Sequence, residues 1–227
     1  MILAVTGLER EVRLIRGPGV RAFGGGGRPQ AALEAALLAV AQGAEAIISI
    51  GLAGALAPGL QPGDWVVADS VAWPGGGAPA DPRWSAALAV RLGARKGAFL
   101  SSDEMMTRAA DKADAGRRWD AVAVDMESRA AALVAQKLSL PFAAARVISD
   151  AADVDLPDAV RVGMRPDGRM AGLAVLLALL RRPGDIPALA RTAVAAGRAF
   201  RALADGRRLL GPRLGLADLG QLALDVG

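Results

Sequence analysis

The sequence contains no cysteine, no histidine and no tyrosine. Without cysteine there are no disulfide bonds, thiolate nucleophiles or cysteine-bound metal ions, and without histidine the commonest catalytic base and metal ligand is missing. A serine–histidine triad is therefore excluded, and no metal site is expected. Proton transfer near neutral pH has to rely on aspartate or glutamate carboxyls whose pKa is tuned by their surroundings.

Long hydrophobic runs and dense positive charge are also missing. The longest apolar run without serine, proline or charge covers residues 170–180, which is shorter than the about 20 residues that a membrane-spanning helix needs. The net charge is only +4 and no basic run is interleaved with aromatic residues, so nucleic-acid binding is not expected. The first residues lack the features of a secretory signal, which favours a cytoplasmic location.

The chain has 227 residues, of which 53% are hydrophobic, and is long enough for one domain that buries a full sheet. Short apolar segments typical of strands alternate with longer patterns typical of helices. The expected strands are residues 2–6, 46–50, 65–68, 121–124 and 142–149, the expected helices include 29–41 and 126–137, and the Pro- and Gly-rich residues 72–82 are expected to form a loop. This alternation predicts a single α/β domain over residues 1–227, with a mixed, largely parallel central sheet flanked by helices on both faces.

Residues 154–227 are expected to form a divergent helical C-terminal part with two helices rich in alanine and leucine. In the second of them Arg191, Arg198 and Arg201 fall on one side, with Val194 and Phe200 largely elsewhere. Such a basic amphipathic segment is consistent with a solvated face of a terminal helix or with peripheral contact at a membrane surface.

Acidic residues follow several of the expected strands. Glu11 comes after the first strand, Asp125 and Glu127 after residues 121–124, and Asp150 after residues 142–149. In open parallel sheets the ligand crevice lies at the carboxyl ends of the strands, so these groups are expected to converge there. Each acid alone would be equally consistent with a helix cap or a solvated turn, and the glycine-rich residues 51–54 with a tight connection.

The ordered segments that carry these acids resemble a known family. Residues 124–128 (VDMES) followed by 147–153 (VISDAAD) are similar to the paired signature of the nucleoside phosphorylase superfamily, closest to its methylthioadenosine/S-adenosylhomocysteine nucleosidase branch. Residues 7–12, 24–27, 49–63 and 101–103 agree with the same family in order. The resemblance covers residues 1–153 and implies cleavage of the N-glycosidic bond of a purine nucleoside, with no cofactor.

The resemblance assigns roles to four side chains. It implies that Asp150 protonates the purine ring nitrogen N7, and burial at a strand end is expected to help it hold a proton. It implies that Glu127, kept ionised at a helix start, binds both ribose hydroxyls, and that Met126 packs against the sugar. Glu11 matches the glutamate that deprotonates the attacking water. From the residues alone, Asp150 as a turn cap, Glu11 as a helix N-terminal acid and Met126 as a core residue remain alternatives.

Two positions depart from the family pattern and leave the nucleophile open. The remaining pocket residues implied by the resemblance are Gly51, Leu52, Ala53, Gly54, Met105 and Ser149. Leu52 replaces a hydroxyl residue and Met105 replaces an aromatic residue, which makes the pocket more apolar. The loss of the hydroxyl weakens the case for phosphate as a co-substrate, because a phosphate dianion needs several converging donors. Arg10 and Arg28 are the remaining phosphate candidates, and water is slightly favoured.

The tail beyond residue 153 resembles a bacterial subgroup, the hopanoid-associated phosphorylases. This implies a lipid-linked purine nucleoside, adenosylhopane, as the substrate, and peripheral contact with the inner membrane. The family also implies a homo-oligomer. Two other functions stay open: a soluble purine nucleoside phosphorylase or nucleosidase for small substrates, and a non-catalytic nucleoside-binding module.

Overall fold

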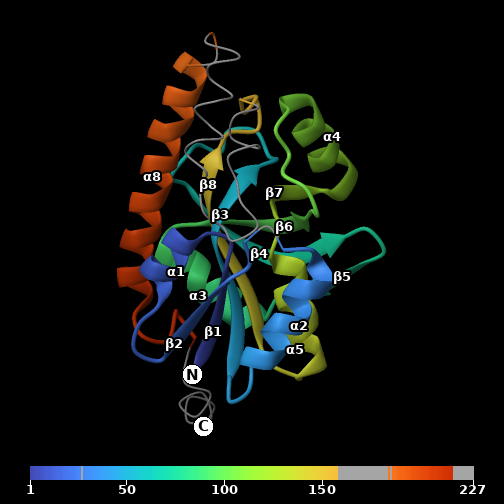
Figure 1. Ribbon diagram of the computed structural model, residues 1–227, viewed down its shortest axis with the longest axis vertical. Coiled ribbons are helices and arrows are strands. Elements are labelled where there is room, and N and C mark those ends of the chain that lie inside the picture. Colours follow the sequence, from blue (N-terminus) through green and yellow to red (C-terminus); the bar gives the residue numbers. More distant parts are fainter. Residues whose placement is uncertain (27, 158–183, 185, 217–227) are drawn as a thin grey trace.

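An eight-stranded mixed sheet forms the centre of the molecule (Figure 1). The computed structural model describes residues 1–26, 28–157, 184 and 186–216. The strands are β1 (Ile2–Thr6), β2 (Val20–Gly24), β3 (Ala46–Ala55), β4 (Trp65–Trp73), β5 (Gly76–Pro79), β6 (Arg95–Ser101), β7 (Ala121–Asp125) and β8 (Phe142–Asp150). All five residues of β1 are buried, as are eight of the nine in β8, because both strands lie inside the sheet and consist mainly of apolar residues.

Most strand pairs are parallel. Parallel pairing joins β1 to β2 and β3, β3 to β8, β4 to β6, and β6 to β7. Antiparallel pairing joins β4 to β5 and β8, and the end of β3 to β7. The strands β3, β8, β4, β6 and β7 therefore close into a ring of pairings at the end of the sheet where β3 and β8 terminate. The expectation of a mixed, largely parallel sheet is confirmed.

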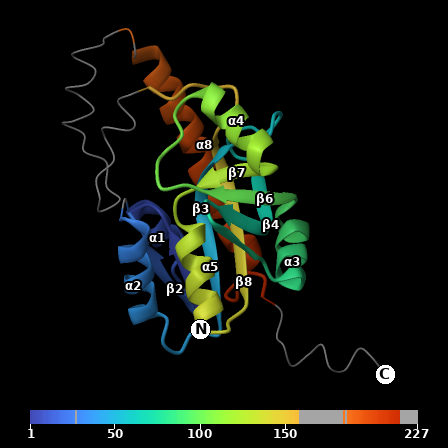
Figure 2. The same cartoon turned by 90° about the vertical axis from the view of Figure 1, so that its right-hand side faces the viewer.

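Helices cover both faces of the sheet, as the sequence predicts (Figure 2). They are α1 (Glu9–Ile15), α2 (Gln30–Val40), α3 (Pro82–Leu92), α4 (Ala109–Trp119), α5 (Ser128–Lys137) and α8 (Ile186–Leu210). The helices α2 and α5 pack together on one face, and α1, α3 and α8 pack on the other. The core is accordingly divided into two apolar layers, one on each side of the strands.

The structure corrects two sequence expectations about loops. Residues 72–82 are not a loop throughout, because β4 runs to Trp73 and β5 pairs with it in a hairpin. A β-carbon at Gly76 would lie 2.8 Å from Trp73 Nε1, so the glycines that suggested a loop are needed where the hairpin covers this indole. Residues 51–54 are not a turn either, since they continue β3 alongside β8. The strands β2 and β6 were also not anticipated.

The second expected C-terminal helix is α8, while residues 170–180, the expected site of the first, lie outside the described residues. The three arginines of α8 that the sequence placed on one side are exposed: Arg191, Arg198 and Arg201. Val194 was expected on another side of the helix, but it lies beside these arginines and is 59% exposed. Among the helices of the described part, none is long and apolar enough to cross a membrane.

Candidate active site

A cavity of about 350 Å³ lies at the carboxyl ends of β1, β3, β7 and β8, with α8 and the segment between β6 and α4 lining its other sides. Asp125 lines this cavity, and so do nine of the twelve residues to which the resemblance gives a site role: Glu11, Leu52, Ala53, Gly54, Met105, Met126, Glu127, Ser149 and Asp150. They come from five separate stretches of the chain, so the topology of the sheet, rather than closeness in sequence, brings them together.

Three of the singled-out residues are not part of the lining. Gly51 lies behind Glu11, where a β-carbon would be 2.7 Å from Glu11 Oε1. The guanidinium of Arg10 stacks on the Phe200 ring at 4.0 Å, and that of Arg28 donates to the carbonyls of Gly24 and Gly25. The two arginines proposed from the sequence as phosphate ligands therefore make other contacts, and neither reaches the cavity wall.

A buried arginine that the sequence argument missed holds the acidic side chains together. Arg146, in the middle of β8, is fully buried and donates from Nε to Asp125 Oδ2 at 2.9 Å and from Nη2 to Glu127 Oε2 at 3.3 Å. Nη2 also donates to Ser49 Oγ at 2.5 Å. The signal was visible in the sequence as the one charge inside the apolar run of residues 142–148, because a charge is rarely buried without a partner.

Glu11 lies in the first turn of α1 and lines the cavity. Its carboxylate accepts hydrogen bonds from three backbone amides: Gly7 at 2.7 Å, Leu8 at 2.6 Å and Leu52 at 2.7 Å. The sequence left Glu11 open as a helix N-terminal acid or as a pocket residue. The structure shows that one side chain does both, because it caps α1 and lines the cavity. Burial raises the pKa of Glu11, although Arg146 and the three amides act in the opposite direction.

Glu127 is the residue before α5 and lies close to Glu11. Burial, together with the neighbouring charges of Asp125 and Glu11, raises the pKa of Glu127 to about 8, with Arg146 opposing the rise. Desolvation thus shifts the pKa of Glu127 in the direction opposite to the one that the start of the helix favours. Since three carboxyls share one guanidinium, the cluster retains a proton readily.

Asp150 ends β8 and is held by a lysine that the sequence argument also missed. Lys112 Nζ, from α4, donates to Asp150 Oδ2 at 2.5 Å, and Ser149 Oγ lies 2.7 Å from Asp150 Oδ1. A β-carbon at Gly54 would lie 3.2 Å from Asp150 Oδ2, so glycine here lets β3 pass close to the carboxyl group. Nothing in the spacing of Lys112 pointed to this contact.

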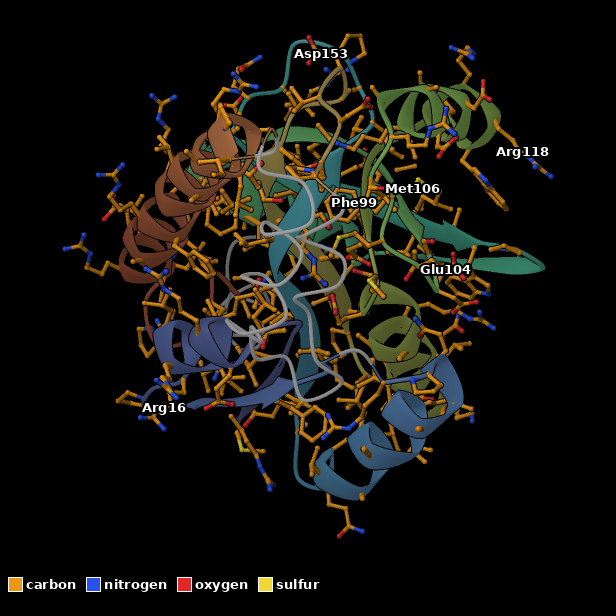
Figure 3. All side chains as sticks on the ribbon, turned by 45° about the horizontal axis from the view of Figure 1, so that its top comes forward. Arg16, Phe99, Glu104, Met106, Arg118 and Asp153 are labelled. Carbon is orange, nitrogen blue, oxygen red and sulfur yellow. The ribbon has the colours of Figure 1, made fainter. Side chains whose placement is uncertain are left out.

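One long wall of the cavity is apolar and comes from α8. Its residues are Leu189, Thr192, Ala193, Ala196 and Phe200. The segment between β6 and α4 adds Glu104, Met105 and Met106, of which Glu104 and Met106 are labelled in Figure 3. The acids therefore cluster on the strand side, and the α8 side offers hydrocarbon surface. Among the described residues, no group of three or more Asp or Glu side chains is arranged to hold a metal ion.

A cavity lined by several buried carboxyls at the strand ends of an α/β sheet is the arrangement expected of an enzyme site that moves protons. The chain belongs to the phosphorylase superfamily, because the model of this family matches residues 9–181. The match extends beyond residue 153, where the resemblance in the sequence ended.

Solved structures with the same fold include several nucleosidases. A 5′-methylthioadenosine/S-adenosylhomocysteine nucleosidase from S. pneumoniae, bound to a transition-state inhibitor, is 17% identical, with a TM-score of 0.60, 92% of this chain covered and 99% of that one. An S-adenosylhomocysteine nucleosidase from Streptococcus pyogenes is 20% identical, with a TM-score of 0.59 and coverages of 90% and 94%. Futalosine hydrolase from Helicobacter pylori is 17% identical, with a TM-score of 0.58 and coverages of 66% and 87%. At these identities the likeness describes the fold.

Proposed function

We propose that the protein cleaves the N-glycosidic bond of a purine nucleoside, with water as the nucleophile. The observation that carries the proposal is the convergence of Glu11, Glu127 and Asp150 on one buried cavity from three separate parts of the chain. Membership of the phosphorylase superfamily and the nucleosidases of like fold support it. A non-catalytic binding module would have no need to retain all three acids.

The reaction needs a proton donor for the departing purine, a base for the attacking water and a group that holds the ribose, and one of the three acids can serve each need. Asp150 gives a proton to the purine N7 as the C1′–N9 bond breaks, so the base departs neutral and the ribose becomes oxocarbenium-like. Glu11 takes a proton from the water that attacks C1′. A raised pKa suits Glu11 to this task, because a base with a higher pKa binds the proton of water more strongly. Glu127 hydrogen-bonds the ribose hydroxyls, and Met126 packs on the sugar.

The charge of the cavity favours water over phosphate. Glu11, Asp125 and Glu127 surround Arg146, which already contacts Asp125, Glu127 and Ser49 and so offers little to a further anion. Arg10 and Arg28 are engaged elsewhere. A phosphate dianion in this cavity would therefore lack the converging donors that it needs.

The apolar wall of α8 supports a substrate with a hydrocarbon group at the ribose 5′ position. Leu189, Ala196 and Phe200 offer no charged side chain for a polar 5′ substituent. Adenosylhopane, which the resemblance of the tail implies, fits this description, and release of adenine from it would place the enzyme in hopanoid biosynthesis. A small thioadenosine is the second candidate, because nucleosidases of like fold carry that name.

The test is release of free adenine from a lipid-linked adenosine, from methylthioadenosine and from S-adenosylhomocysteine, each with and without inorganic phosphate. The proposal predicts adenine release without phosphate and faster cleavage of the lipid-linked substrate. Strict dependence on phosphate would identify a phosphorylase and overturn water as the nucleophile. Cleavage of the thioadenosines alone would overturn the lipid-linked substrate, and no cleavage of any nucleoside would overturn the proposed reaction.

A further inference from the structure

Lys112 is one of three lysines in the chain, and its side chain is fully buried. The other two lysines form ion pairs at the surface. The side chain of Lys96 is 38% exposed and that of Lys137 is 55% exposed. Burying an ammonium group is costly unless each of its N–H bonds finds an acceptor and its charge finds a partner. The buried ammonium of Lys112 therefore needs an acceptor for each N–H bond and a partner for its charge.

The ammonium group has an acceptor for each of its three N–H bonds. Lys112 Nζ donates to Asp150 Oδ2 at 2.5 Å, to the carbonyl of Ala151 at 3.0 Å and to the carbonyl of Val154 at 3.0 Å. It thus fixes the carboxyl of Asp150 and the chain that follows β8 to helix α4. A guanidinium is planar and larger, whereas an ammonium presents its three donors from one compact centre, which suits this arrangement.

Asp150 Oδ1 contacts the hydroxyl of Ser149, which can either donate a hydrogen bond to this oxygen or accept one from it. Ser149 Oγ lies 2.7 Å from Asp150 Oδ1 and 3.1 Å from the carbonyl of Ala53. When Oδ1 is ionised, the hydroxyl donates to it. When Oδ1 carries a proton, Oδ1–H donates to Ser149 Oγ and the hydroxyl donates to the Ala53 carbonyl. Oδ2, held by the ammonium, has no such freedom.

The geometry points to Lys112 as a positioning residue that holds Asp150 by Oδ2, so that the proton delivered to the purine is carried on Oδ1. This inference rests on the proposed function, in which Asp150 is the acid. In the step itself the Oδ1–H bond breaks, the N7–H bond forms, and the electron pair of C1′–N9 stays with the base. Asp150 is left as a carboxylate against the Lys112 ammonium, which stabilises the charge that the transfer creates.

The test compares Lys112→Met with the matched surface variant Lys137→Met on two substrates. One is the adenosine derivative cleaved in the assay above, whose base needs a proton to leave. The other is p-nitrophenyl β-D-ribofuranoside, whose nitrophenolate leaves without one. We expect Lys112→Met to lower kcat for the adenosine derivative about 10- to 100-fold, with KM nearly unchanged and nitrophenyl riboside cleavage retained. Lys137→Met should leave both activities intact.

A purely structural role would slow both substrates alike, and full activity on the adenosine derivative would also overturn the inference. The double variant Lys112→Met with Asp150→Asn should release adenine no more slowly than Asp150→Asn alone, because Lys112 acts through Asp150. Losses of rate that add up in the double variant would contradict this inference. If Lys112→Met fails to fold, Lys112→Gln removes the charge and keeps an N–H donor, with the same outcomes expected. Normal adenine release by Asp150→Asn would instead contradict the proposed function itself.

Discussion

At the residue scale, the site depends on buried charges that balance one another. Asp125 accepts from Arg146 Nε and also from the backbone amide and hydroxyl of Ser128 at the start of α5. Asp125 therefore anchors Arg146, and Arg146 in turn contacts Glu127. This chain of contacts joins β7, β8 and α5, and it holds Glu127 at the cavity through partners that are themselves hydrogen-bonded.

Replacing Arg146 should be costly. In Arg146→Met the carboxyls of Asp125 and Glu127 lose their shared cation while staying buried, so we expect the free energy of unfolding to fall by about 3–5 kcal/mol. Urea denaturation monitored by circular dichroism measures it. Arg117→Met, which removes an exposed ion pair with Asp114, is the matched control and should change stability by less than about 1 kcal/mol. Equal stability of the two variants would contradict the role given to Arg146.

Replacing the proposed acid should separate catalysis from binding. Asp150→Asn keeps the shape of the side chain but has no proton to give to N7, so adenine release should fall by about 10²- to 10⁴-fold. Binding of a nucleoside analogue, measured by calorimetry, should persist. Asp114→Asn, at an exposed position of α4, serves as the control. Turnover at the wild-type rate in Asp150→Asn would refute the assignment of Asp150.

At the scale of elements, the sequence predicted the strands that consist mainly of buried apolar residues and missed those that do not. Residues 2–6 and 142–149 are buried runs without glycine or proline, and both were predicted nearly to the residue. The strand β6 begins with exposed Arg95 and Lys96, and β5 contains two glycines and a proline, so neither shows a strand pattern. These strands exist because pairing with β4 orders them, which is information from tertiary structure.

The helix α8 offers two glycines in contrasting surroundings. A β-carbon at Gly206 would lie 2.3 Å from the Trp65 ring, while one at Gly197 would meet nothing within 4 Å. We expect Gly206→Ala to destabilise the protein by about 1–3 kcal/mol through overpacking, and Gly197→Ala to stabilise it by up to about 1 kcal/mol through helix propensity. Thermal unfolding of both variants measures this. A stabilising Gly206→Ala would mean that α8 does not pack tightly on Trp65.

At the scale of the whole molecule, the sequence could place the acids but not the contributions that α4 and α8 make to the site. The rule that parallel strands end at a common edge brings Glu11, Glu127 and Asp150 together once the strands are recognised. No such rule applies to Lys112 of α4, which contacts Asp150, or to Phe200 of α8, which lines the cavity, because tertiary packing places both helices. The arginines expected on a solvent or membrane face of α8 are exposed, and the opposite side of the helix lines the cavity.

The shared protonation of the acidic cluster should make the stability of the whole protein depend on pH. The pKa of Glu127 is raised from 4.5 to about 8, and that of Glu11 is raised as well, so between these values the folded protein holds protons that the unfolded chain has released. The folded state then binds more protons, and the free energy of unfolding must fall as pH rises from about 5 to 8, by up to about 1.4 kcal/mol per pH unit for each proton.

Glu127→Gln removes one of these protons and should flatten the slope measured by urea denaturation at pH 5, 6, 7 and 8. Glu34→Gln, in a surface pair with Lys137, should leave the slope unchanged. A slope as steep in Glu127→Gln as in the wild type would show that Glu127 does not carry the retained proton.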